Sequence, residues 1–235
     1  GARPSAIQRR DPLSADRRKG APPVIVIGLG RFGTSVAQSL TRLGHEVLGV
    51  DHDMGIVQTL SEELTHVVQA DTTNPATLKR LGAGDMSYAV VGIGSDIESS
   101  VLTVLALQDA GCANIWAKAV NENHGRILAR VGATHVVYPE AEMGERVAHL
   151  VTGQMIDFIE FDDGFAIVKT RTPAFMAGKT LAETDVRKTH KVTIVGVKRP
   201  REPFLHAVPE TVIYLSDLLI VSGATDAVER FAALC

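Results

Sequence analysis

A glycine-rich segment near the start of the chain has the residue types and spacing of a phosphate-binding loop. Gly28, Gly30 and Gly33 follow the apolar run Val24–Ile27 and precede a stretch with helical periodicity. In such a loop the first glycine makes a tight turn, the second lets the backbone approach a phosphate, and the third allows close helix–strand packing. A phosphate there meets free N–H groups and the positive end of the helix dipole. The segment predicts nucleotide binding, against the alternative of a glycine turn without a ligand.

An acidic residue lies at the distance from this loop that nucleotide binding needs. Asp51 stands 23 residues after Gly28, where a carboxylate can accept hydrogen bonds from ribose hydroxyls. The same negative charge repels a 2′-phosphate, so the pattern disfavours NADP. We therefore expect an adenine nucleotide. Its expected site also includes Leu29 and Phe32 from the glycine-rich loop and His52, which follows Asp51.

Two further positions in this part of the chain have competing interpretations. Arg31 lies inside the loop, where a guanidinium can clamp additional phosphate oxygens, or it is a solvent-exposed arginine at a helix start. Asp71, followed by Thr72, ends the apolar run that begins at His66. In that place it either meets the nucleotide base or caps the next helix.

The fourth and fifth apolar runs end in residues that belong at the same edge of a sheet. Gly92, Ile93 and Gly94 either bring backbone close to a nucleotide crevice, the cleft at the carboxyl ends of parallel strands, or form a plain turn. Lys118 ends the fifth run at that edge, although most lysines are simply solvated.

The sequence offers little for catalysis. It has no G-x-S-x-G, H-E-x-x-H or Walker lysine motif, and its eight histidines are scattered. Cys112 and Cys235 are far apart and cannot form a metal framework; two such cysteines weakly favour a reducing compartment. We expect a protein that is not an enzyme. The alternative, a small NAD(H)-dependent oxidoreductase, would need a substrate domain from about 80 C-terminal residues.

The elements that must position these residues alternate between residues 22 and 139. Short apolar runs, most of them β-branched, alternate with amphipathic segments, which predicts an α/β fold with a doubly wound, Rossmann-like parallel sheet. Helix limits are signalled by Gly44 as a stop, by Asp53 as a start and by Asn74-Pro75 as a cap. The six expected strands are Val24–Ile27, Glu46–Val50, His66–Gln69, Tyr88–Val91, Ile115–Lys118 and His135–Tyr138.

The pattern changes after Pro139 and predicts a small α+β C-terminal lobe. Residues 140–153 read as a connecting helix, and residues 154–235 form the lobe, which begins with a hairpin around Asp162-Asp163-Gly164. Its expected elements are strands at Ile156–Phe161, Phe165–Thr170, Val192–Lys198, Thr211–Tyr214 and Leu218–Ser222, and a helix at Asp226–Leu234.

Charge and hydropathy exclude several classes of protein. Residues 1–21, which we expect to be a disordered tail, carry six Lys/Arg and two Asp, whereas the chain as a whole has a net charge of −3. The acidic remainder argues against nucleic acid as a partner, and no helix-turn-helix supports a redox-sensing transcription factor. No apolar run approaches the ~20 residues that a membrane span needs.

One expected helix, residues 97–108, is apolar around nearly its whole circumference. A helix that covers one face of a sheet needs only one apolar stripe, so the surplus must be buried against something else. A subunit interface and deep burial inside the monomer are the two alternatives.

Four segments together resemble the RCK (regulator of potassium conductance) family, within it the cytosolic KtrA/TrkA-type subunits of Ktr/Trk potassium transporters. The resemblance covers residues 22–235 and rests on the segments GLGRFG at 28–33, GVD at 49–51, NIWAKA at 114–119 and VVYPEAEMG at 136–144. It implies a Rossmann-like RCK N-terminal domain and a TrkA-C-like C-terminal lobe.

The resemblance also implies function, partners and location. Family members form homo-oligomeric gating rings, usually octamers built from dimers, on a KtrB/TrkH-like membrane potassium channel subunit, so the chain would be cytoplasmic and peripheral at the inner face of the membrane. ATP and ADP, or in relatives NADH and NAD, compete for the crevice. Arg31 would face the terminal phosphate, and Glu140 matches an acidic position that in some members helps to hold a divalent or sodium cation between subunits.

In some relatives the C-terminal lobe binds cyclic di-AMP between two subunits. Matching positions here are Leu181, Asp185, Val186 and Arg187. Thr193, however, stands where members that bind cyclic di-AMP often have Asn, which disfavours this second ligand. The alternative is a turn-and-strand segment of a dimer interface.

Overall fold

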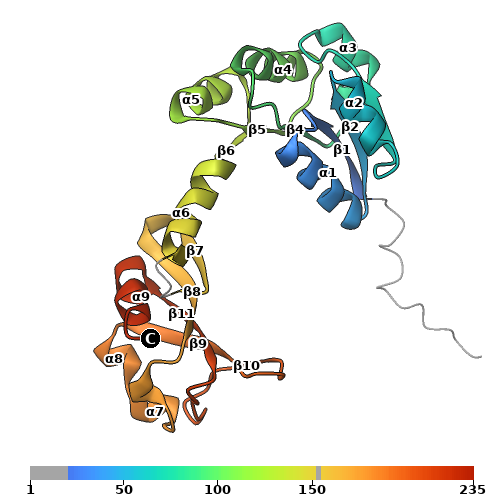
Figure 1. Ribbon diagram of the computed structural model, residues 1–235. Helices are drawn as coiled ribbons and strands as arrows, with labels where there is room; N and C mark the ends of the chain where they lie inside the picture. Colours follow the sequence, from blue (N-terminus) through green and yellow to red (C-terminus); the bar gives the residue numbers. More distant parts are fainter. Residues whose placement is uncertain (1–20, 152–154) are drawn as a thin grey trace, which may run out of the picture. The chain divides into compact units, whose positions relative to one another are not determined.

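The computed structural model describes residues 21–151 and 155–235, and it divides into two compact units between Pro139 and Glu140. Each unit contains one sheet, six-stranded in the N-terminal unit and five-stranded in the C-terminal one (Figure 1). Each also has its own core of buried side chains. The expected tail and residues 152–154 lie outside the described residues, apart from Ala21, which begins the first strand.

The N-terminal sheet is parallel throughout and has the order β3-β2-β1-β4-β5-β6. The order reverses between β1 and β4, which is the switch point where doubly wound folds bind ligands. The doubly wound parallel sheet predicted from the sequence is therefore confirmed. Its strands are β1 (Ala21–Ile27), β2 (His45–Asp51), β3 (His66–Gln69), β4 (Tyr88–Val91), β5 (Ile115–Lys118) and β6 (His135–Val137).

Helices cover both faces of this sheet because alternate residues of each strand point to opposite sides. Val24 and Val26 of β1 pack in one core with residues of α1 and α2, whereas Ile25 and Ile27 pack in another with residues of α3, α4 and α5. Figure 1 shows α1 on the side of the sheet away from α4 and α5. The helices are α1 (Arg31–Arg42), α2 (Met54–Leu60), α3 (Pro75–Arg80), α4 (Ile97–Asp109) and α5 (Glu122–Val131).

The predicted helix limits are confirmed by the cap geometry. Gly44, with a φ of 87°, follows the end of α1. The Asp53 side chain accepts from the N–H groups of Gly55 and Ile56 at the start of α2, and Asn74 caps α3, which begins at Pro75. These signals are local, because a cap needs only the few residues around it.

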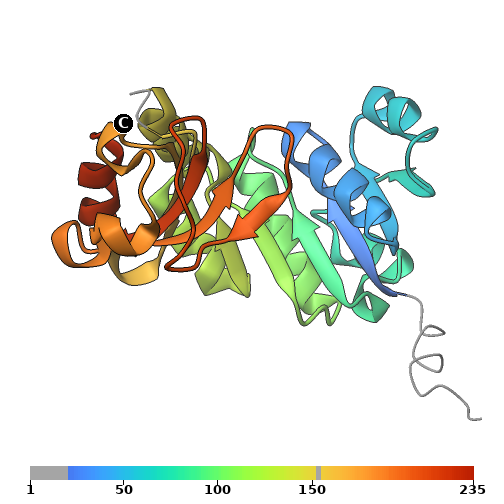
Figure 2. The ribbon, with the colours of Figure 1, turned by 90° about the horizontal axis from the view of Figure 1, so that it is seen from below.

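The C-terminal unit is the predicted α+β lobe. Its antiparallel sheet has the order β10-β9-β11-β8-β7, and Phe158, Leu219 and Phe231 share a core between one face and α9. Figure 2 shows α9 along that sheet. The elements are α6 (Pro139–Val151), β7 (Asp157–Phe161), β8 (Phe165–Arg171), α7 (Leu181–Thr184), α8 (Val186–Thr189), β9 (Val192–Lys198), β10 (Phe204–His206), β11 (Leu218–Ala224) and α9 (Thr225–Ala232).

One expected strand is wrong and one observed strand was not expected. Residues 211–214 form no strand but a single bridge between Val212 and Thr180, because a turn closed by Asp217 follows directly. The edge strand β10, which pairs with β9, was not predicted. Three residues after a proline carry too little pattern to identify a strand.

Helix α4 keeps part of its apolar surface exposed. Val104 and Leu107 are fully buried, whereas Ile97, Leu102 and Leu105 are about 40% exposed, at 41%, 39% and 41%. Deep burial of the whole circumference inside the monomer is therefore excluded. No helix in the described ranges is both long and apolar enough to span a membrane.

Candidate nucleotide site

The loop between β1 and α1 has the close packing that its three glycines predict. Gly28 has a φ of +82°, and a Cβ on Gly33 would lie 2.0 Å from the Gly28 carbonyl oxygen. By contrast, a Cβ on Gly30 would have no atom of the described part of the chain within 4 Å. Gly28 and Gly33 are thus needed by the fold, whereas Gly30 leaves open space at the N-terminus of α1, where a phosphate can reach backbone N–H groups.

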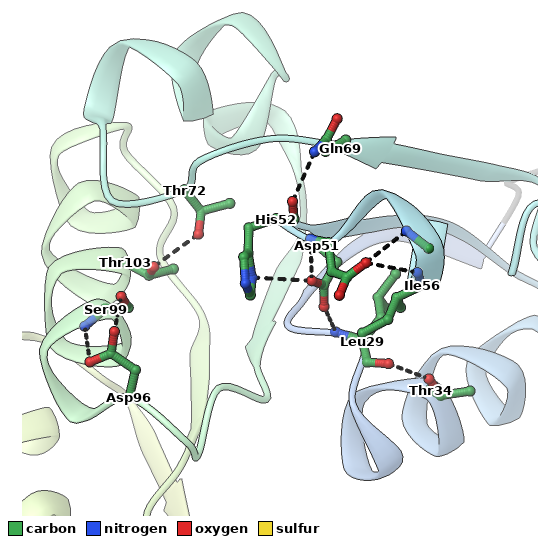
Figure 3. A network of polar contacts seen from close by, with 12 residues as sticks. Leu29, Thr34, Asp51, His52, Ile56, Gln69, Thr72, Asp96, Ser99 and Thr103 are labelled. Atoms are coloured by element: carbon green, nitrogen blue, oxygen red, sulfur yellow. Dashed lines mark hydrogen bonds and ion pairs between the residues drawn. The ribbon is translucent and has the colours of Figure 1, made fainter. Parts of the chain in front are cut away.

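The Asp51 carboxylate ties the end of β2 to this loop. It is 5% exposed; its Oδ2 accepts from the Leu29 N–H at 2.6 Å and its Oδ1 from the Asp53 N–H at 2.9 Å. Figure 3 shows Asp51 between Leu29 and His52, whose Nδ1 lies 3.3 Å from Oδ1. A carboxylate has about four lone-pair sites, so Asp51 keeps capacity for ribose hydroxyls.

The loop after β3 makes its polar contacts within the protein. The Asp71 Oδ1 accepts from the Thr73 N–H at 3.0 Å and from its hydroxyl at 2.7 Å, and these bonds hold the pKa of the exposed Asp71 below its usual value. The buried Thr72 hydroxyl lies 2.9 Å from that of Thr103 in α4 (Figure 3). Asp71 thus shapes the turn into α3, while Asn74 caps that helix.

The loops after β4 and β5 converge on the same edge of the sheet. A Cβ on Gly28 would lie 2.8 Å from the Ile93 side chain, and one on Gly92 would lie 2.8 Å from the Gly28 carbonyl oxygen. A Cβ on Gly94 would lie 3.2 Å from the Lys118 Nζ. The loops that follow β1, β4 and β5 are therefore in contact.

Two charged candidates flank this edge. Lys118 Nζ lies 5.8 Å from the centroid of the Phe32 ring, within the range of a cation–π contact. Arg31 begins α1 and is exposed, and its side chain has no partner among residues 21–151 and 155–235. Arg31 is thus available to an anion at the helix start.

A separate groove of about 520 Å³ lies between α1 and α2. It shares Leu29 with the phosphate loop and Asp53 with the loop after β2, and the rest of its lining comes from α1, from α2 and from Glu63 beyond α2. Its lining residues are Leu29, Thr34, Gln38, Asp53, Gly55, Ile56, Thr59, Leu60 and Glu63.

The expected cation position is in the first turn of α6, at Glu140. Among the described residues, no group of three or more His, Cys, Asp or Glu side chains could hold a metal ion. One chain therefore gives no complete ligand set there.

Four of the C-terminal candidates, Leu181, Asp185, Val186 and Arg187, lie in or between the short helices α7 and α8, and the fifth, Thr193, lies in strand β9. Asp185, with a φ of 48°, separates α7 from α8, and Val186 is buried in the core of the lobe. Arg187 is exposed, and Leu181 and Thr193 are half-buried. Val186 is thus held by core packing, whatever the lobe binds.

Sequence reasoning missed one polar residue beside the site. His124 in α5 is 1% exposed; its Nδ1 accepts from the Val120 N–H at 3.3 Å, and its Nε2 has no hydrogen-bond partner among the described residues. Burial lowers the pKa of its imidazole. The signal was its spacing from Leu128 and Val131, four and seven residues on, which places His124 on the buried face of the helix.

Comparisons with known proteins agree with the two-unit structure. The TrkA-N domain model matches residues 24–139, and the TrkA-C domain model matches residues 166–235. The Ktr system potassium uptake protein C of Bacillus subtilis is 36% identical over 88% of this chain and 94% of its own length. The Ktr system potassium uptake protein A of Vibrio alginolyticus is 31% identical over 89% of this chain and 96% of its own length.

Solved structures support the same fold. The RCK domain of GsuK superposes with a TM-score of 0.63 at 20% identity, covering 93% of this chain and 48% of that one. The GsuK channel bound to NAD gives 0.62 at 20% identity, over 93% of this chain and 40% of that one. The two domain matches, and identity above 30% along nearly the whole chain, confirm the resemblance: the chain belongs to the family of KtrA-type RCK subunits of potassium uptake systems.

Proposed function

We propose that this chain is a gating subunit, regulated by ATP and ADP, that assembles as a ring on a KtrB/TrkH-like membrane channel subunit and controls K⁺ uptake. In this proposal it is cytoplasmic, peripheral to the membrane, and not an enzyme. The observation that carries the nucleotide part is the open space over Gly30, beside the buried Asp51 and at the N-terminus of α1. The similarity of the chain to Ktr potassium uptake proteins supports the proposed role in K⁺ uptake.

Calorimetric titration of the purified protein with ATP, ADP, NADH and NADPH tests the ligand. ATP and ADP are expected to bind most tightly, NAD(H) is the alternative, and NADPH should bind worst because Asp51 repels a 2′-phosphate. No binding of any adenine nucleotide, or tightest binding of NADPH, would contradict the proposal. Hydride transfer from NADH to an acceptor would favour an oxidoreductase instead.

Arg31 supplies the means to distinguish ATP from ADP. A ligand shifts a conformational equilibrium only through interactions that differ between states, and a γ-phosphate beside an exposed guanidinium is such a difference. Arg31→Ala is expected to weaken ATP binding about tenfold, the value of one charge-assisted contact, and ADP binding much less. Arg42→Ala, in the last turn of the same helix, is the control. Equal loss of both nucleotides on Arg31→Ala would contradict this role.

The exposed apolar residues of α4 supply a surface for ring assembly. Leu102 and Leu105 are 39% and 41% exposed on a helix whose opposite face, with Val104 and Leu107, is buried in the core. Leu105→Asp is expected to weaken self-association at least about tenfold, because a carboxylate would be buried unpaired in an apolar interface. Light scattering after size-exclusion chromatography measures this. Leu43→Asp, at a site 73% exposed, is the control, and an unchanged mass for Leu105→Asp would exclude α4 from the interface.

The channel partner is tested in cells that lack other K⁺ uptake. Co-expression of this chain with its membrane subunit is expected to restore growth at low K⁺, and a chain that cannot bind nucleotide should restore less. Restoration to the same extent by the membrane subunit alone would contradict the regulatory role.

The proposal includes two further ligands that the family resemblance implies. A cation would be held by Glu140 of two subunits related by a two-fold axis, because a single carboxylate is a poor cation site. Cyclic di-AMP would lie at Asp185 and Arg187 of the C-terminal lobe, with Thr193 disfavouring it. Equilibrium dialysis against each labelled ligand tests both.

A further inference from the structure

The buried His124 has no part in the site described so far, although it is bonded to a loop at the edge of that site. Its Nδ1 accepts from the Val120 N–H, so in the neutral ring the proton is on Nε2. A second hydrogen bond joins the loop to the first turn of α5, because the Asn121 side chain accepts from the His124 N–H at 2.9 Å. The loop at 119–121 is thus anchored to the helix through one imidazole and one amide.

This loop stands against the loop that follows β4. A Cβ on Gly94 would lie 3.4 Å from Cγ1 of Val120, next to Lys118, and Val120 itself is 43% exposed. In a doubly wound sheet, ligands bind outside the carboxyl ends of the strands, where these two loops begin. Val120 therefore lies at the ligand-binding edge expected of this sheet, beside the loop that follows β4.

We infer that His124 is a positioning residue, whose neutral imidazole holds the β5–α5 loop in the wall of the nucleotide crevice and makes nucleotide binding sensitive to acid. The inference rests on the proposed function, since it requires a nucleotide in this crevice. An imidazolium has no acceptor, so protonation of Nδ1 breaks the bond to Val120 and releases the loop. Burial also disfavours protonation, because the positive charge of the imidazolium would be removed from water.

Burial lowers the pKa of His124, because it disfavours the charged imidazolium. Because the folded-state pKa lies below the unfolded value of 6.5, the folded form binds the proton less well. The stability that the neutral ring contributes is present above pH 6.5 and is lost as the pH falls through the folded value. The ionisable groups on α5 and on the elements packed against it are Glu122, Arg126, Arg130, Lys118, His135, Tyr138, Glu98 and Asp109.

The test compares three variants of the full chain by calorimetric titration with ATP. His124→Leu removes the acceptor and is expected to weaken binding about fivefold or more. His124→Asn places an amide oxygen near the Nδ1 position and is expected to retain most of the affinity, without the loss that the wild type shows as the pH falls below 6.5 through the lowered pKa of His124. Leu128→Ala, a cavity variant one turn further along α5, should lower the melting temperature but leave ATP affinity unchanged.

The possible results are distinguishable. Equal ATP affinity for the wild type and His124→Leu, or the same pH dependence for the wild type and His124→Asn, would overturn the inference alone. If His124→Leu does not fold, the pH dependence of ATP binding by the wild type and by His124→Asn still tests the inference. Protonation of ATP itself affects both proteins equally, so it does not alter the difference between them. No ATP or ADP binding by the wild type at any pH would overturn the proposed function together with this inference.

Discussion

Replacing Gly30 by alanine is expected to weaken adenine-nucleotide binding about tenfold or more while leaving the melting temperature unchanged. The backbone there has a φ of −64°, which alanine adopts freely, and the new methyl group would meet no atom of residues 21–151 or 155–235 within 4 Å. It would instead stand where a phosphate approaches the N-terminus of α1. Loss of one charge-assisted hydrogen bond is worth about 1.5–3 kcal/mol, which is at least tenfold in affinity. Calorimetric titration and thermal unfolding measure the two effects.

Gly144→Ala is the matched control for this change. Gly144 lies inside α6, and a Cβ there also has nothing within 4 Å among the residues that the structure describes. Alanine is the better helix former, so the control should gain about 0.5–1 kcal/mol in stability and keep its nucleotide affinity. If Gly30→Ala and Gly144→Ala bind nucleotide equally well, the space over Gly30 is not the phosphate site.

Replacing Asp51 by alanine is expected to cost both stability and binding. The variant loses the acceptor for two N–H groups, of Leu29 and Asp53, at a position that is only 5% exposed. Hydrogen bonds to a charged group contribute about 1.5–3 kcal/mol each, so the free energy of unfolding should fall by about 3 kcal/mol. Nucleotide binding should become undetectable, because the loop and the ribose acceptor are lost together. Urea unfolding and titration with ATP measure these changes.

Asp71→Ala is the control, since it removes an equivalent carboxylate from the end of the neighbouring strand. Asp71 is exposed and, in the described part of the chain, forms side-chain hydrogen bonds only to Thr73 in its own turn, so the loss in unfolding free energy should stay below about 1 kcal/mol. A similar loss for both variants would show that Asp51 has no special part in the loop.

The features that the sequence predicts well are those with local causes. The phosphate loop is identified by glycine spacing, because Gly28 is required by its positive φ and Gly33 by the Gly28 carbonyl oxygen that lies beside it. Helix limits at Gly44 and Asp53 depend on a few neighbouring residues, and the parallel sheet follows from apolar runs that alternate with helices.

The features that the sequence does not reveal depend on distant partners. The segment at 211–214 has the apolar residues of a strand, but it forms a single bridge, between Val212 and Thr180. The strand β10 is defined by its pairing with β9. The same limit applies to the site. The burial of His124 is decided by packing around α5, and the bond between Asp51 and Leu29 joins residues that are 22 positions apart.

That bond has a consequence for how fast a bound ligand can be replaced. Asp51 holds Leu29 through a contact made within the protein, so the loop has its shape whether or not a nucleotide is present. A preorganised loop loses little conformational entropy when it takes up a ligand. Replacement of one nucleotide by another is then limited by the dissociation rate of the first, with no step in which the loop must rebuild. A regulator with such a loop would follow the cellular ratio of two competing nucleotides with a delay equal to one residence time.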